Sequence, residues 1–75
     1  GSRAYYDSIR RLITIEMFLE NKHVDILEIN NQLIKIVGET LLSLIKNDET
    51  IEKEKIKFLR EIIKEKLTLI KNKFK

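Results

Sequence analysis

Residues 24–46 read VDILEINNQLIKIVGETLLSLIK, and this stretch decides the fold. Its apolar residues recur at helical steps in two lines, one made of Ile26, Ile29, Leu33 and Ile36 and the other of Leu27, Ile34, Val37, Leu41, Leu44 and Ile45. A double line of this period predicts a helix with an apolar stripe wide enough to be contacted on two sides. We therefore expect one central helix over residues 24–46, about 34 Å long at 1.5 Å per residue.

Gly38 lies inside this expected helix, where a glycine costs roughly 1 kcal/mol relative to alanine. A continuous helix through this position would need a reason for the missing side chain. We expect that reason to be the close approach of another helix, with a kink as the alternative.

Two further helical patterns flank the central stretch. Before it, over about residues 3–20, a line of apolar residues steps by three and four through Tyr6, Ile9, Ile13 and Met17. After it, over about residues 50–72, a similar line runs through Ile56, Leu59, Ile63, Leu67 and Ile70, and the opposite side carries Lys53, Lys57, Arg60, Glu61 and Lys64. Both patterns predict amphipathic helices with one side toward a core.

Short polar breaks separate the three segments. Asn21 suits both the end of one helix and the cap of the next, and Asp25 would then lie in the first turn of the second helix. Asp48 or Thr50 is the expected N-cap of the third. Because connections this short place consecutive helices side by side, the predicted fold is all-α, an antiparallel three-helix bundle with helices at about 3–20, 24–46 and 50–72.

The length of 75 residues indicates one domain. We interpret residues 1–2, Gly-Ser, as a tag remnant and residues 3–75 as a single helical domain, a candidate fragment of a longer protein. The chain has no cysteine and one histidine, so a disulfide or a metal shell of nitrogen and sulfur ligands is excluded as its stabiliser, and a partner subunit is the option left. Neither a leader nor a membrane-spanning run is visible, which favours an intracellular, cytoplasmic location.

The aromatic residues divide into two groups. We assign Phe18 and Phe58 to the core, and Tyr5, Tyr6 and Phe74, near the chain ends, to contacts with another subunit. The broad surface of the central helix supports the same idea, since three helices of this size leave part of it uncovered. The predicted interface residues there are Leu27, Ile34, Leu41 and Leu44. The favoured function is a non-catalytic interaction module, either a homo-oligomer or a subunit of a larger complex.

The charge distribution offers an alternative. Residues 1–49 carry six Lys and Arg against eight Asp and Glu, whereas residues 50–75 carry nine against four. A basic final helix could contact nucleic-acid phosphates without sequence specificity. Lys64, Lys66, Lys71, Lys73 and Lys75 are the residues that would do so.

Residues for chemistry are few. His23 stands alone in a connector, and the carboxylate pairs Glu16 with Glu20 and Glu61 with Glu65 each share a helical face but have no partner histidine motif. We therefore expect no catalytic residue, no metal, no cofactor and no small-molecule substrate, and we predict that the chain is not an enzyme.

Residues 33–37 (LIKIV), 47–55 (NDETIEKEK) and 58–59 (FL) resemble the helical domain of archaeal GINS replication-complex subunits. That family has a Lys-Ile pair late in one long helix and a Thr-x-Glu-Glu type cap at the start of the next. The resemblance implies a non-catalytic scaffold within a replicative helicase assembly, with helix faces packed on sister subunits.

Overall fold

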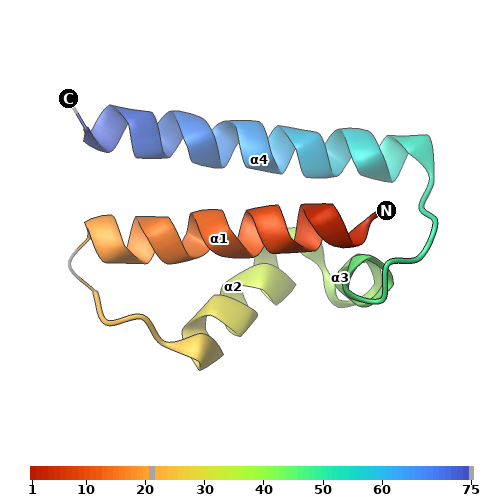
Figure 1. Cartoon of the computed structure of the whole chain (residues 1–75), viewed down its shortest axis with the longest axis horizontal. Coiled ribbons are helices and arrows are strands. Elements are labelled where there is room, and N and C mark those ends of the chain that lie inside the picture. The colour runs from red at the N-terminus through yellow and green to blue at the C-terminus, as the bar shows by residue number, and fades with distance from the viewer. Residues whose placement is uncertain (21, 75) are drawn as a thin grey trace.

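The computed structural model describes residues 1–20 and 22–74, and every regular element within them is a helix. These elements are α1 (Arg3–Leu19), α2 (Ile26–Val37), α3 (Glu39–Lys46) and α4 (Lys53–Lys73) (Figure 1). The predicted all-α class is confirmed. The described residues hold four helices where three were predicted, because residues 24–46 form α2 and α3 rather than one continuous helix.

The break between α2 and α3 lies at Gly38. Its backbone has φ 91° and ψ 146°, a combination that residues with a side chain essentially do not adopt. No atom lies within 4 Å of the point where a Cβ would stand, so the expected close approach of another helix is wrong. The glycine instead redirects the chain: α2 runs obliquely to α1, while α3 is seen nearly end-on (Figure 1).

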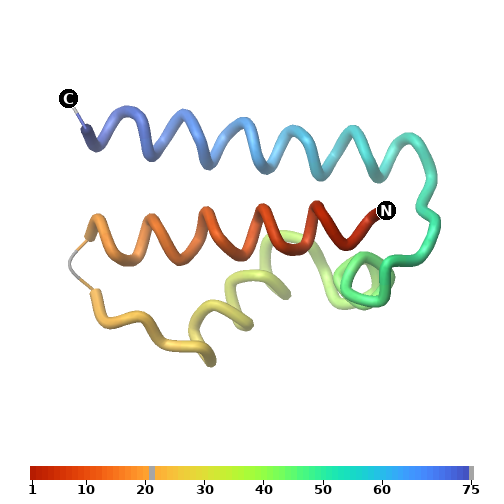
Figure 2. Tube along the Cα trace, viewed as in Figure 1, coloured from red at the N-terminus to blue at the C-terminus, as the bar shows by residue number. Residues whose placement is uncertain are grey.

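The central element is α1, not the segment 24–46. α1 contacts all three other helices, whereas α4 packs mainly on α1 (Figure 2). The bend at Gly38 explains the difference, since it divides one long apolar stripe into two short faces that both turn toward α1. α1 and α4 run in the same direction, as the first and third limbs of an up-down-up arrangement must.

The core takes residues from every helix. Six aliphatic side chains are almost fully buried: Ile9, Ile13, Ile29, Leu33, Ile45 and Leu59. Burying one such side chain stabilises the folded state by about 1.5–3 kcal/mol. Phe18 and Phe58 were expected here, but they are 72% and 43% exposed, because their positions fall on or beyond the edge of the buried faces of α1 and α4.

The connector after α3 ends one helix and caps another. Glu49 N donates to Leu44 O and Asp48 N donates to Ile45 O. These are the two hydrogen bonds of a Schellman motif, and Asp48 lies in the left-handed region at φ 58°. The carboxylate of Asp48 then accepts from the backbone N–H of Arg3 at 2.9 Å. Asp48 thus caps α1, and the prediction that Asp48 or Thr50 caps α4 is wrong: the N-cap of α4 is Glu52.

The connector between α1 and α2 is longer than expected. Asp25 is the N-cap of α2, where its side chain accepts from Leu27 N at 2.9 Å, rather than a residue of the first turn. The predicted role of Asn21 lies outside the described residues. At the other end of α1, Ser2 is buried, and its hydroxyl donates to Glu49 O.

None of the helices in the described residues combines the length and the apolar character needed to cross a bilayer.

Candidate interaction surfaces

The flank of α2 that faces solvent carries two of the predicted interface residues. Leu27 is 73% exposed and Ile34 is 40% exposed. They are seven residues apart, which places them two turns apart on one side of the helix. Asn30 and Asn31 lie between them on the same flank, so this surface of α2 is uncharged; we call these four residues the α2 flank.

Two other predicted interface residues belong to the core. Tyr6 and Leu41 are each 7% exposed and pack in the main hydrophobic cluster. Leu41 faces inward because α3 turns at Gly38, and Tyr6 does so because it shares a helical face with Ile9 and Ile13. Neither side chain is available to a partner, which corrects both predictions.

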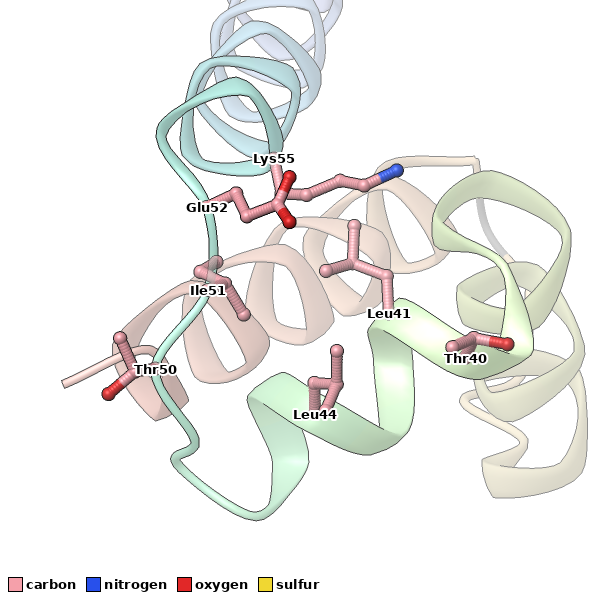
Figure 3. A pocket seen from close by; sticks show the side chains of 7 residues that line it. All are labelled: Thr40, Leu41, Leu44, Thr50, Ile51, Glu52 and Lys55. Carbon is pink, nitrogen blue, oxygen red and sulfur yellow. The ribbon is translucent and has the colours of Figure 1, made fainter.

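Leu44 is half-buried and lines a hollow of about 240 Å³ between α3 and the start of α4. Figure 3 shows Leu41, Leu44 and Ile51 around it, with Glu52 and Lys55 at one rim. The lining has no nucleophile beside a base and no group of metal ligands.

The remaining predicted aromatics differ in exposure. Tyr5 is half-buried against the core, and Phe74, the C-cap of α4, is 72% exposed. They lie near opposite ends of the α1–α4 pair, so they do not form one site.

The lysines predicted to contact nucleic acid do not form one row. Lys66 Nζ lies 2.9 Å from Glu16 Oε1, and both side chains are about 15% exposed. Lys73, which is exposed, pairs with Glu20, so both of these lysines are paired with carboxylates of α1. Lys64 and Lys71 are exposed, and Lys75 lies outside the described residues.

The contacts with lysines also change the pKa of Glu20. Its hydrogen bond with Lys73, and a second contact with Lys22 at 3.2 Å, lower the pKa of the Glu20 carboxyl below its ordinary value. Glu16 and Glu20, which share a helical face, therefore serve to hold α1 against α4.

The structure presents a different basic row on α4, which includes only two of the predicted lysines. Its members step by three, four or seven residues, and all are exposed: Lys53, Lys57, Arg60, Lys64 and Lys71. Helical spacing alone could have selected this row, whereas the prediction used a run of lysines near the end of the chain. Within residues 1–20 and 22–74, no carboxylate oxygen lies within 4 Å of these five cations.

His23 is exposed in the connector between α1 and α2. The part of the chain that the structure describes contains no group of three or more His, Cys, Asp or Glu residues able to hold a metal ion.

Comparison with known proteins found no matching family model, no matching curated protein and no matching solved structure. The resemblance to the GINS helical domain therefore rests on the quoted residues. In the structure the Lys35–Ile36 pair lies in the last turn of α2, a helix of 12 residues, and Thr50 and Glu52 precede the first turn of α4.

Proposed function

We propose that the chain is a non-catalytic helical interaction module that associates through the α2 flank. The observation that carries this proposal is the exposure of Leu27 and Ile34 on one side of a helix whose other side is fully used by the core. Large apolar side chains that are exposed singly are ordinary. Leu27 and Ile34 differ because they share one side of α2, with two uncharged asparagines between them.

A second copy of the chain is the partner that this flank fits best. When two α2 helices pair antiparallel about a two-fold axis between Asn30 and Asn31, Leu27 of one copy meets Ile34 of the other. The same operation places Asn30 opposite Asn31, where their amides can bond across the interface. Asn30 Oδ1 already accepts from Arg10 Nη1 at 3.1 Å, which leaves its NH2 group to donate.

This contact is small, and association is weak in consequence. Each buried leucine or isoleucine contributes at most about 1.5–3 kcal/mol, while association itself costs about 4–15 kcal/mol. The dimer should therefore populate at high micromolar concentration rather than at nanomolar concentration. In a larger intracellular complex the same flank would pack on another subunit; the resemblance to GINS subunits makes a DNA-replication complex the setting that we propose.

Sedimentation equilibrium tests the proposal. The wild-type chain should show a concentration-dependent rise in mass up to a dimer, and the double variant Leu27→Glu/Ile34→Glu should remain a monomer. Leu69→Glu is the matched control, since Leu69 is a comparably exposed residue on α4. A wild-type monomer at high micromolar concentration that also melts at high temperature would refute self-association.

Nucleic-acid binding is the second candidate function, and the exposed basic row of α4 is the observation that favours it. Binding of an oligonucleotide at low salt that weakens steeply with added salt would support it.

A further inference from the structure

The α1–α4 pair has one uncovered side. α2 and α3 lie against the other side of α1, where Arg10 bonds to Asn30. Leu19 follows Arg10 by nine residues, two and a half helical turns, and so lies on the opposite side of α1. On α4, Phe58 lies on the side toward α2 and α3, since it lines a hollow with Gly38 and Thr40. Leu67 follows Phe58 by nine residues and therefore lies on the opposite side of α4.

Apolar residues from both helices line this uncovered side. Tyr5, Ile15 and Leu19 of α1 and Ile56 and Ile63 of α4 are half-buried, and Leu67 is 44% exposed; we call these six residues the α1–α4 strip. At one end of the strip, Tyr5, Ile51 and Ile56 border a hollow of about 320 Å³. α1 and α4 cover these side chains in part, and connector residues 49–51 border the strip at its Tyr5 end.

The border of the strip is basic. The row of five cations on α4 runs directly beside it, because Lys53 and Arg60 are the i−3 and i+4 neighbours of Ile56, and Lys64 and Lys71 are those of Leu67. From Lys53 to Lys71 the row spans about 27 Å. On the α1 side the exposed neighbours of Ile15 include Arg11 at i−4 and Phe18 at i+3.

The acidic side chains near the strip are few, and some of them are already paired with lysines. Glu16 and Glu20 of α1 face α4, where Lys66 and Lys73 compensate them. Glu54 and Glu65 lie on the far side of the basic row, and Glu49 borders only the hollow at the end of the strip. Glu61 is the exception, because it lines a hollow with Ile56 of the strip, but Lys53, Lys57 and Arg60 line that hollow too. The strip therefore combines an apolar floor with a positive edge.

We infer that the α1–α4 strip is the docking surface for an acidic amphipathic helix of a partner protein. A helix of about 18 residues would match the length of the basic row, with its apolar side on the strip and its carboxylates beside the cations. A second copy of this chain is disfavoured there, because its own basic row would be brought against the first. Nucleic acid would use the cations and leave the apolar floor exposed, so the combination favours the acidic helix.

This inference rests on the proposed function, that of an interaction module, but it concerns another surface and another partner. The probe is a fluorescent synthetic helix of about 18 residues with leucines on one side and glutamates flanking them. Its counterpart has lysines in place of the glutamates. The glutamate peptide should bind the full chain at micromolar concentration, more weakly as salt is added, and the lysine peptide should bind at least about tenfold more weakly.

Variants locate the site. Lys57→Glu/Lys64→Glu should weaken binding of the glutamate peptide about tenfold or more, whereas Lys35→Glu/Lys46→Glu, which reverses two exposed charges on α2 and α3, should change it less than about twofold. Leu67→Asp should also weaken binding, and Leu69→Asp, on the other edge of α4, should not. Circular dichroism confirms that each variant is folded.

Three outcomes overturn the inference. They are no binding of the glutamate peptide at about 100 µM and low salt, equal binding of the lysine peptide, and tighter binding of an oligonucleotide that Leu67→Asp does not affect. The Leu27→Glu/Ile34→Glu chain should bind the peptide as the wild type does. Loss of peptide binding in that variant would place the site on α2. The peptide experiment and the sedimentation experiment therefore test the strip and self-association independently.

Discussion

At the scale of single residues, two positive φ angles set the position of α3. Gly38 precedes the helix at φ 91°, and Asp48 follows its C-cap at φ 58°. Glycine has no side chain to clash, and aspartate tolerates the left-handed region through local hydrogen bonding. Asp48 has a further role, because its carboxylate accepts from Arg3 N and so fixes the end of α3 to the start of α1.

The path of the chain at Gly38 could not be predicted from apolar spacing. Leu33, Val37, Leu41 and Ile45 step by four across the break, and all four are buried. The pattern of one straight helix therefore continues through a point where two helices meet. Only the glycine itself signalled the bend, and the sequence offered a close helix contact as an equally physical explanation.

Gly38→Ala should lower the free energy of unfolding by about 1–3 kcal/mol, the cost of holding a residue with a side chain in this backbone conformation. Urea unfolding followed by circular dichroism measures it. Asn31→Ala, on the exposed face of α2, is the control and should be neutral or slightly stabilising. If Gly38→Ala stabilised the protein, residues 24–46 would prefer one continuous helix, which would contradict the bend between α2 and α3.

At the scale of helices, two ion pairs fix how far α4 is shifted along α1, the helix to which it runs parallel. Glu16 pairs with Lys66 and Glu20 with Lys73, toward the C-terminal ends of both helices. The two glutamates are one turn apart on α1, and the two lysines are two turns apart on α4. Apolar periodicity predicted both helices and the inward side of α1. On α4 the predicted line contains buried Leu59 and Ile70 but also Leu67, which is 44% exposed. The periodicity could not predict which lysine of α4 meets which glutamate of α1, since that depends on how far one helix is shifted along the other. For this reason the ion pairs of Lys66 and Lys73, two of the lysines predicted to contact nucleic acid, could not be predicted from the sequence.

The two ion pairs should differ in their effect on stability. Lys66→Met leaves the Glu16 carboxylate, whose side chain is 15% exposed, without its partner and should cost about 1–3 kcal/mol. Lys73→Met removes a more exposed contact of Glu20 and should lower the stability less than Lys66→Met does. Urea unfolding of both variants compares them. Equal losses would mean that the Glu16–Lys66 pair is as hydrated as the other.

At the scale of the whole molecule, α1 is the element on which the others pack, and the two candidate surfaces lie on different sides of it. The α2 flank contains Leu27 and Ile34, which the sequence placed on the second of two apolar lines. The periodicity could not separate these two exposed residues from Leu41 of the same line, which is buried. The α1–α4 strip was not predicted. It depends on α2 and α3 covering only one side of the α1–α4 pair, and that arrangement follows from the bend at Gly38 rather than from the spacing within any helix.

A central α1 makes a prediction about cooperative unfolding. Amides opened only by global unfolding should be concentrated in α1, around Ile9 and Ile13, because this helix cannot leave without exposing the buried faces of the other three. The first turn of α2 and the last turn of α4 should exchange by local opening, since Ile26, Leu27 and Phe74 are exposed there. Native-state hydrogen exchange followed by NMR gives the free energy of opening for each amide. Slowest exchange in α2 and α3 together, with α1 opening first, would restore segment 24–46 as the centre of the fold and remove the basis for an uncovered α1–α4 strip.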